Sequence, residues 1–245
     1  MDYQIVTLKE QPELEKELGR LHEIGWPTFM RMDPVADLYW DRMLTNYPEL
    51  QFFLLEGDRI LACGHAIGFE WDGEIANLPE GWDGVIEKGV LDKEANKNIN
   101  AVSAISIVID PAHQGKGLSE IMVRAMKGLA KNAGLTQMVA PVRPSMKPKY
   151  PLLPIESYAY LIREDGQPFD PWIRVHCKTG AEIVAIAHQS MIVEAEIADW
   201  EKWTGMKLPL TGEYVIPGAL VPLVVNIEEN KAVYVEPNVW LRHHL

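Results

Sequence analysis

Cysteine is scarce in this sequence: only Cys63 and Cys177 occur among its 245 residues. Two cysteines so far apart do not suggest a disulfide framework, and they agree with a reducing compartment. No apolar run approaches the ~20 residues that a membrane span needs. The first ten residues contain no basic segment followed by an apolar core, so no signal peptide is visible. We therefore expect a soluble, cytoplasmic protein with no membrane partner.

Positive charge is also in short supply. The chain has 23 Lys and Arg against 35 Asp and Glu, which gives a formal net charge of −12. An acidic chain binds nucleic acid poorly, so we expect no nucleic-acid partner. Internal repeats and low-complexity segments are absent, and 47% of the residues are hydrophobic. These properties favour one domain over residues 1–245, large enough to carry inserted segments.

The clearest local pattern is a strand, a glycine-rich turn and a helix between residues 101 and 133. A β-branched run that includes Ile107, Val108 and Ile109 indicates a buried strand. Asp110-Pro111 ends the strand, because proline has no N–H for the ladder. The turn itself is Gln114-Gly115-Lys116-Gly117-Leu118-Ser119, and apolar residues at helical spacing follow it.

This geometry suits an anionic ligand. The first N–H groups of a helix have no partner in the helix and carry the positive end of its dipole. Glycines let the backbone approach a ligand closely, so such a turn can hold a pyrophosphate. The alternative is an ordinary strand–turn–helix corner with glycines used for packing. The turn contains neither the G-x-G-x-x-G nor the G-K-[ST] fingerprint.

The strand and turn together resemble motif A of the GCN5-related N-acetyltransferase (GNAT) superfamily, Gln/Arg-x-x-Gly-x-Gly/Ala after a strand. Gln114 and Gly117 match the motif, and Ser119 stands where Gly or Ala is usual. The resemblance implies a CoA thioester as ligand. It places the pyrophosphate on the N–H groups of Gln114, Gly115, Lys116, Gly117, Leu118 and Ser119, and it pairs the pantetheine arm with the strand at Ile107, Val108 and Ile109.

The order of the other predicted elements agrees with this resemblance. A strand at 3–8, helices at 11–24 and 34–46 and a hairpin of 51–55 with 59–69 give the opening order of the GNAT fold. Further strands are predicted at 136–142, 182–187 and 191–197, and further helices at 168–180 and 198–205. A terminal hairpin is predicted from 220–227 and 232–235.

The expected fold is therefore α/β (α+β): a GNAT-like mixed twisted sheet flanked by helices and splayed where CoA enters. Insertions are expected at about 70–98, with a short helix at 84–91, and at about 143–167. A C-terminal β-hairpin extension is expected at about 205–245.

A candidate proton donor lies in the predicted helix at 168–180. GNAT enzymes often carry Tyr-x-x-x-Gly-Phe there, and the tyrosine protonates the departing CoA sulfur. His176 stands in the tyrosine position of the matching stretch His176-Cys177-Lys178-Thr179-Gly180-Ala181. Histidine can donate or accept a proton near neutral pH, although a packed helix histidine is the plain alternative.

Other charged residues give weaker signals. A base for the acceptor is least defined: Glu70 and Asp72 could act through water or could be solvated turn residues. Several cations could gather near the nucleotide end of CoA, although each could equally be a solvated surface residue: Lys116, Arg124, Lys127, Lys131, Lys147 and Lys149. The adjacent His243 and His244 are not a ligand constellation, so we expect no metal.

Most of the chain beyond residue 140 is also similar to the GNAT-like domains of polyketide synthase loading modules. The stretches that carry this similarity are PVRPS (141–145), YPLLPIESYA (150–159), DGQPFDPWIRVH (165–176), WEKWTGM (200–206), PGALVP (217–222) and EPNVW (236–240). The resemblance implies a malonyl-type CoA thioester, its decarboxylation and transfer to a carrier-protein thiol.

The same resemblance implies catalytic roles for His176 and Ser145, which stands in the threonine position of Pro-Val-Arg-Pro-Thr. It implies a substrate-tunnel role for Trp26. The arginine of that family falls near Met191 or Ile192, and neither is basic. This departure weakens the expectation of malonyl recognition. In a decarboxylation, donors such as the Ser145 hydroxyl would stabilise the enolate and His176 would protonate carbon.

We therefore expect an enzyme, a GNAT-type acyltransferase with acetyl-CoA or malonyl-CoA as acyl donor. The expected acceptor is an amine or a carrier-protein thiol. The alternatives are a malonyl-CoA-type decarboxylase and a non-catalytic acyl-CoA-binding module.

Overall fold

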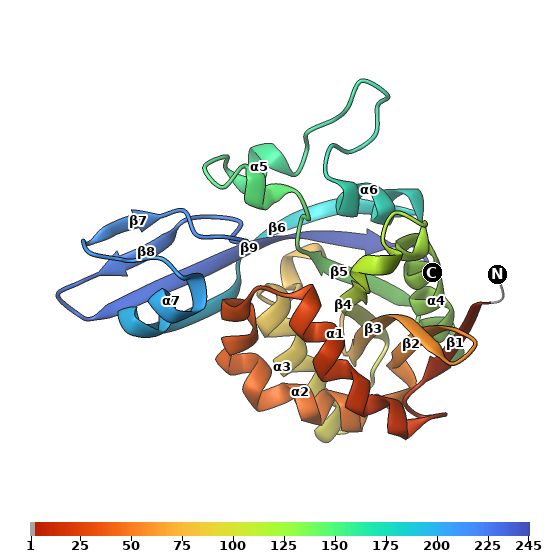
Figure 1. The fold of residues 1–245 in the computed structure, drawn as a ribbon. Coiled ribbons are helices and arrows are strands. Elements are labelled where there is room, and N and C mark those ends of the chain that lie inside the picture. The colour runs from red at the N-terminus through yellow and green to blue at the C-terminus, as the bar shows by residue number, and fades with distance from the viewer. Residues whose placement is uncertain (1–2) are drawn as a thin grey trace.

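The computed structural model describes residues 3–245, and the strands within this range form one mixed sheet (Figure 1). The strand order is β1-β2-β3-β4-β5-β9-β8-β7, and β6 pairs with the other edge of β9. The strands are β1 (Tyr3–Thr7), β2 (Gln51–Glu56), β3 (Arg59–Phe69), β4 (Ala101–Ile109), β5 (Gln137–Val142), β6 (Ala181–Glu196), β7 (Gly212–Tyr214), β8 (Leu223–Asn226) and β9 (Lys231–His243). The helices are α1 (Leu18–Gly25), α2 (Pro34–Asn46), α3 (Gly81–Glu94), α4 (Leu118–Asn132), α5 (Ile155–Tyr158), α6 (Pro171–Lys178) and α7 (Ile197–Thr204).

The sheet opens between β4 and β5. These two strands are parallel and pair only from Ala101 to Ser103, opposite Gln137 to Val139. Beyond that point β5 keeps its ladder with β9 on its other edge, up to Val142 opposite Val239. The two strands therefore diverge after Ser103, which confirms the predicted splay in the centre of the sheet.

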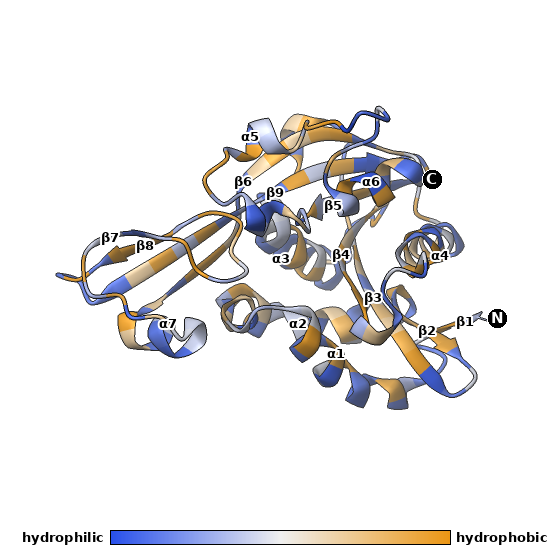
Figure 2. Ribbon diagram, turned by 45° about the horizontal axis from the view of Figure 1, so that its top comes forward, coloured by the Kyte–Doolittle hydropathy of each residue, from blue (hydrophilic) through white to orange (hydrophobic). Residues whose placement is uncertain are grey.

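Helices cover both faces of the sheet. Figure 2 shows α4 on one face of strands β1 to β4, with α1, α2 and α3 on the other. Gly25, at the end of α1, lies so close to β4 that an added Cβ would be 2.6 Å from a Val108 methyl carbon. On the opposite face α4 buries Met122 and Met126. The core therefore lies in two layers, one on each face of the sheet.

The predicted helices form with different bounds. The segment 11–24 begins as a 3₁₀ helix over Pro12–Glu17 and becomes α1 only at Leu18. Helix α3 is longer than the predicted 84–91. Helix α6 is shorter than 168–180, because the Asp170 side chain caps it by accepting hydrogen bonds from Trp172 N and Ile173 N.

The predicted terminal hairpin forms as β8 and β9, and β9 then continues beyond Val235 to His243, between β5 and β6. Pro237 lies inside β9, opposite the irregularity of β6 between Ala187 and Met191. Proline is tolerated there because the ladder is interrupted. The strands predicted at 182–187 and 191–197 are one strand, β6, which continues through this irregularity.

Strands β7 and β8 and the first half of β9 project away from the rest of the sheet, with α7 beside them (Figure 1). Phe29 attaches this part to the segment between α1 and α2: its ring centroid lies 5.5 Å from that of Trp200 and 5.1 Å from that of Tyr234. Within residues 3–245, no helix is both long and apolar enough to cross a bilayer.

Candidate active site

The glycine loop (residues 114–119) connects the end of β4 to the start of α4. Gly115 and Gly117 have φ of 76° and 77°, a left-handed conformation that glycine adopts at little cost. Gly117 is the N-cap of α4, and an added Cβ would meet nothing within 4 Å at either glycine. Gln114, Gly115, Lys116 and Gly117 are exposed. The loop therefore presents backbone N–H groups at a helix N-terminus to solvent, an arrangement that can bind an anion.

The strand before the loop has one free edge. Ile107, Val108 and Ile109 pair with Gly64, Cys63 and Ala62 of β3. Their other backbone edge faces the region where β4 and β5 have separated, because β4 pairs with β5 only up to Ser103. An extended ligand can add to such an edge through backbone hydrogen bonds. The loop and the free edge follow one another along the chain, as the site residues predicted from the sequence require.

His176 lies on α6 and is 1% exposed. Its Nδ1 lies 2.9 Å from Nε2 of His243 in β9, and its ring packs edge-on against Trp172. Burial, and then the neighbouring His243, hold the pKa of His176 well below its usual value. Its Nε2 is buried without a hydrogen-bond partner among the described residues. The imidazole is therefore neutral at neutral pH, and its Nε2 lies in the interior without a partner among the described residues.

Ser145 lies in an exposed turn after β5, and its backbone N–H donates to Asp170 Oδ1 at 3.2 Å. The same carboxylate accepts from Met146 N and from the Tyr158 hydroxyl, and it also caps α6. Asp170 therefore ties the turn that carries Ser145 to the helix that carries His176. Asp170 was not among the residues selected from the sequence.

Trp26 is the residue after α1, and its backbone N–H donates to His22 O at 3.1 Å. It is half-buried against the main core. It follows Gly25, which lies against Val108 of β4. Trp26 therefore follows directly on the contact between α1 and the strand that precedes the glycine loop.

One expected cation is not a surface residue. Lys147 is fully buried, and its ammonium donates to the backbone oxygens of Tyr150 and Leu220 at 2.8 and 2.7 Å. The prediction that it could join a cationic patch near the CoA nucleotide is therefore wrong. Glu70 and Asp72 follow Phe69, which pairs with Ala101 at the closed end of β4. They line a surface pocket there with Trp71 and Asn100.

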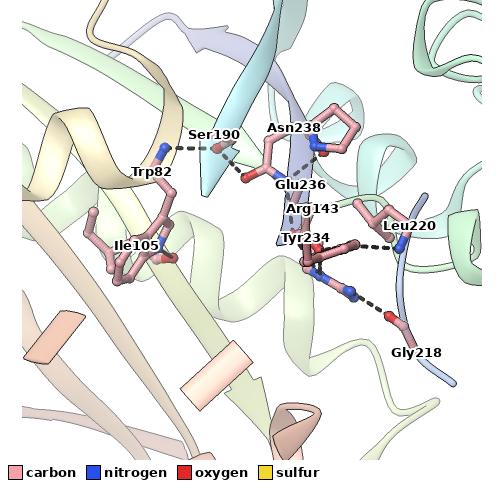
Figure 3. Close-up of polar contacts among 10 residues, drawn as sticks. Trp82, Ile105, Arg143, Ser190, Gly218, Leu220, Tyr234, Glu236 and Asn238 are labelled. Atoms are coloured by element: carbon pink, nitrogen blue, oxygen red, sulfur yellow. Dashed lines mark hydrogen bonds and ion pairs between the residues drawn. The ribbon is translucent and has the colours of Figure 1, made fainter. Parts of the chain in front are cut away.

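A continuous hydrogen-bond network runs from the opening in the sheet to β9 (Figure 3). Trp82 of α3 donates from Nε1 to Ile105 O at 2.9 Å and from its backbone N to Ser190 Oγ at 2.8 Å. Ser190 donates to Asn238 Oδ1, and Asn238 Nδ2 donates to Glu236 Oε1. Ile105 lies two residues beyond the last β4 residue that pairs with β5, so the network reaches the site of divergence.

Glu236 ends this network in a buried ion pair. Its carboxylate accepts from Arg143 Nε at 2.9 and 3.0 Å and from the Tyr234 hydroxyl at 2.7 Å. Arg143 also donates to Gly218 O, and Tyr234 accepts from Leu220 N. Arg143 belongs to the PVRPS stretch, but no local pattern indicates its partner, which is 93 residues away.

Two further carboxyl groups meet near this network, and we refer to Asp33 and Asp83 as the carboxyl pair. Asp33 caps α2, and Asp83 lies in the first turn of α3. Burial raises the pKa of both carboxyls, and the charge of Asp33 raises that of Asp83 further. Asp83 Oδ2 also accepts from Ile192 N at 3.1 Å. Met191 and Ile192 stand near the position of the arginine in the polyketide loading domains. In this chain the charged group that contacts Ile192 is the carboxylate of Asp83.

A second buried cluster lies beneath α1. His22 Nε2 and His65 Nε2 are 3.1 Å apart, and His65 Nδ1 lies 2.9 Å from Gln51 Oε1. Cys63 lies on the same face of β3, and one donor atom from each of His22, Cys63 and His65 falls within 4.8 Å of the others. Burial, then nearby Arg31, lowers the pKa of His22 to about 4, and burial raises the pKa of Cys63 to about 12. A hydrogen bond between two neutral imidazoles accounts for this arrangement.

The chain is similar to known proteins both in sequence and in fold. No family model matches it. It is 31% identical to the arginine N-acetyltransferase avaD of Aspergillus versicolor over 274 aligned residues, which cover 98% of this chain and 93% of that protein.

Solved structures share its fold. The loading GNATL domain of CurA from Lyngbya majuscula aligns with a TM-score of 0.64 at 18% identity, over 100% of this chain and 98% of that one. The GphF GNAT-like decarboxylase in complex with isobutyryl-CoA aligns with a TM-score of 0.59 at 15% identity, over 100% and 99% of the two chains. The sheet is splayed between β4 and β5, a glycine loop follows β4, and the similarity to an N-acetyltransferase extends along nearly the whole chain. The protein therefore belongs to the GNAT superfamily.

Proposed function

We propose that this protein is an N-acetyltransferase that transfers the acetyl group of acetyl-CoA to an amine of a small cationic molecule. The observation that carries the proposal is its similarity to an arginine N-acetyltransferase, which extends over nearly the whole of both chains. The charge near the opening agrees, because Asp83 follows Trp82, whose Nε1 donates to Ile105 O where β4 and β5 have separated. A carboxyl group there favours a cationic acceptor over an anionic acyl chain.

The chain supplies the parts that this transfer needs. The N–H groups of the glycine loop bind the pyrophosphate of CoA, and the free edge of β4 at Ile107 to Ile109 pairs with the pantetheine arm. The acceptor nitrogen attacks the thioester carbonyl, a C–N bond forms, and the C–S bond breaks. The acceptor ammonium loses one proton to solvent before attack. As the C–N bond forms, the attacking nitrogen gives a second proton to His176 Nε2, and His176 passes it to the departing CoA thiolate, so the imidazole is neutral before and after the step.

The neutral state of His176 is compatible with this role. When His243 Nε2–H donates to His176 Nδ1, the His176 proton is on Nε2, the atom without a partner. When His176 Nδ1–H donates to His243 Nε2 instead, His176 Nε2 has no proton and can accept one from the attacking nitrogen. Ser145 is exposed in the turn tied to α6 by Asp170, where its hydroxyl can contact a substrate.

Malonyl-CoA is a weaker candidate for the donor. Its free carboxylate needs a cation, and the positions expected to supply one are Met191 and Ile192. Arg143 lies close to this position, because its partner Glu236 pairs with Met191 across β6 and β9, but its charge is already matched by Glu236. We therefore propose acetyl rather than malonyl as the acyl group, and an amine rather than a carrier-protein thiol as the acceptor.

The test is mass spectrometry of acetyl-CoA and malonyl-CoA, each incubated with the protein alone and with L-arginine, n-butylamine or L-glutamate. Acetylated L-arginine together with free CoA is the expected result, with slower transfer to butylamine and none to glutamate. Conversion of malonyl-CoA to acetyl-CoA without any acceptor would overturn the proposal in favour of decarboxylation. Binding of acetyl-CoA with no turnover under any condition would identify a non-catalytic binding module.

A further inference from the structure

Three side chains of types that bind metal ions meet between α1 and β3, and we refer to His22, Cys63 and His65 as the His–Cys cluster. One donor atom from each residue lies within 4.8 Å of the donor atoms of the other two. Cys63 and His65 share one face of β3, because the side chains of a strand alternate between its faces. His22 reaches them from α1. No step of the proposed acetyl transfer uses these residues.

The hydrogen bonds of His65 leave a lone pair in the His–Cys cluster. Gln51 Nε2 donates to the backbone oxygens of Tyr47 and Ala66, both at 2.9 Å, so Gln51 Oε1 is the amide atom that faces His65. This oxygen lies 2.9 Å from His65 Nδ1, which therefore carries the ring proton, and His65 Nε2 carries none. Histidines that bind a metal through one nitrogen usually donate from the other nitrogen to such an acceptor.

The spacing of the donor atoms suits a small tetrahedral ion. His22 Nε2 and His65 Nε2 are 3.1 Å apart. Zinc binds imidazole nitrogen at about 2.0–2.1 Å and thiolate sulfur at about 2.3 Å, which sets the donor atoms roughly 3.3–3.6 Å apart around the ion. The two rings therefore need to separate only slightly to bind an ion. In the metal-free protein, a hydrogen bond from His22 Nε2–H to His65 Nε2 holds them in this geometry.

Solvent reaches the His–Cys cluster at the His22 ring. His22 is partly exposed, and the residues that follow it in α1, Glu23, Ile24 and Gly25, are exposed. Among the described residues, His22 Nδ1 has no hydrogen-bond partner, and it is not one of the buried nitrogens that lack a partner, so it contacts solvent. The bond to His65 is the one hydrogen bond of the His22 ring within residues 3–245. The ring can therefore turn outward and admit an ion to the two interior donors.

The charges around the His–Cys cluster are compatible with a bound cation. Arg20 acts on Cys63, and Arg31 acts on His22. Arg20 forms ion pairs with two carboxylates, and Arg31 is exposed to water. Neither arginine therefore places an unmatched charge in the interior. A Cys63 thiolate would itself offset half the charge of a divalent ion.

We propose that His22 Nε2, Cys63 Sγ and His65 Nε2 bind one Zn²⁺ ion, with water as the fourth ligand, and that this ion ties α1 to β3. Imidazole and thiolate are ligands that zinc prefers, and a site with three protein ligands keeps one position for water. On binding, the Cys63 thiol releases its proton to solvent. The His22 ring loses its proton from Nε2 and takes one up on Nδ1, so one proton is released in total. The expectation of no metal came from spacing along the chain, and here two ligands are 43 residues apart.

The first test is absorption spectroscopy with Co²⁺, which occupies zinc sites and has a near-ultraviolet charge-transfer band when a thiolate binds it. The whole chain is used without a histidine tag, after dialysis against EDTA. We expect the band to saturate at one Co²⁺ per chain and to disappear when Zn²⁺ is added. Cys63→Ser should lack the band. Cys177→Ser, which replaces the other cysteine of the chain, should retain it. Absence of the band from the wild type, or its loss in Cys177→Ser alone, would overturn the inference.

The second test measures Zn²⁺ affinity by competition with a chromophoric chelator. His22→Gln should weaken Zn²⁺ binding by about 100-fold or more, because loss of a group that only orients a ligand already costs about 10–100-fold. His188→Gln is the matched control and should bind Zn²⁺ as the wild type does, because His188 is an exposed histidine of β6 that pairs with Glu156. Equal Zn²⁺ affinity in the two variants would contradict the proposed site.

The two tests remain decisive if one variant does not fold. Should Cys63→Ser fail to fold, His22→Gln still tests the site, because His22 is partly exposed and its replacement leaves the interior of the strand intact. Zn²⁺ should raise the Tm of the wild type and of His188→Gln, and leave that of His22→Gln unchanged. None of these measurements needs acetyl transfer, so the inference stands or fails independently of the proposed function.

Discussion

His176 and His243 are joined by a hydrogen bond of 2.9 Å between Nδ1 and Nε2, and this bond connects helix α6 to the last strand of the sheet. Both imidazoles are neutral at neutral pH: burial lowers the pKa of His243 to about 4 and holds that of His176 well below its usual value. The bond therefore couples the tautomers of the two rings. The ring that donates carries its proton in the bond, and the ring that accepts carries its proton on the other nitrogen.

Replacement of His176 tests its assignment as the proton donor. His176→Gln should lower kcat by about 100-fold, in the range typical of lost general acid catalysis, with the Kd for acetyl-CoA within threefold of wild type. His243→Gln should lower kcat less, because only the tautomer preference is lost. The measurement is steady-state CoA release together with calorimetric binding. A His176→Gln enzyme with wild-type kcat would remove His176 from the mechanism.

The glycine loop has a matched pair of variants. Gly117→Glu should abolish detectable acetyl-CoA binding, because it places a carboxylate and a Cβ where the pyrophosphate is proposed to lie. Gly57→Glu is the control: Gly57 also has a positive φ of 59° and open space around its Cβ, but it lies in the turn between β2 and β3. Both variants should lose similar stability. Equal acetyl-CoA affinity in the two variants would contradict the assignment of the loop.

The loss of one member of the buried ion pair between Arg143 and Glu236 should lower the free energy of unfolding more than the loss of both members. Glu236→Leu should lower the free energy of unfolding by about 3–5 kcal/mol, because it leaves a buried guanidinium without its partner. The double variant Arg143→Met/Glu236→Leu should recover a large part of that loss. Urea unfolding of the wild type, both single variants and the double variant gives the coupling energy. A coupling energy near zero would show that the pair is not a stabilising unit.

Stability should depend on pH with a maximum near pH 6.5. His22, His65, His176 and His243 all have lowered pKa values in the folded protein, so the unfolded chain binds more protons than the folded chain as pH falls below 6.5. Their contribution is lost as pH falls from about 6.5 toward 4. The raised pKa of Asp83, about 8, acts in the opposite direction, so stability should decline modestly as pH rises from 6.5 to 8.

Thermal unfolding from pH 4 to 9 would measure this profile. Asp83→Asn should flatten its alkaline side and leave the acidic side in place. A Tm that rises steadily from pH 6.5 to 8 in the wild type would contradict the assignment of a raised Asp83 pKa.

Local sequence patterns were sufficient to predict most elements of the fold. Asp33 before Pro34 predicts the start of α2, and the β-branched run with the glycine loop predicts β4 and α4, because these signals act over a few residues. The path of β9 was harder: the predicted strand ended at Val235, and Pro237 is acceptable in the longer strand only because it lies opposite the β6 irregularity. That compensation lies on another strand and has no local signal.

In the candidate site, too, some residues have a local sequence signal and others depend on how distant elements pack. The glycine loop and His176 follow from motifs. The carboxyl pair does not, because Asp33 and Asp83 look like ordinary helix-start residues, and their proximity depends on how α2 and α3 pack together. Lys147 is the converse case: a lysine in a proline-rich loop suggests a solvated cation, yet two backbone oxygens hold it in the interior.

The position of β9 has a consequence for how the protein is made. Strand β9 is the last of the described strands along the chain, and it fills the place between β5 and β6, which are synthesised before it. Until it leaves the ribosome, one edge of β5 is unpaired, and His176 lacks the histidine that orients it. Such edges invite pairing with other chains, and long-range pairing is slow to form. An interrupted translation product that lacks residues 231–243 would therefore be both inactive and prone to aggregation, so activity reports on completed synthesis of the chain as far as β9.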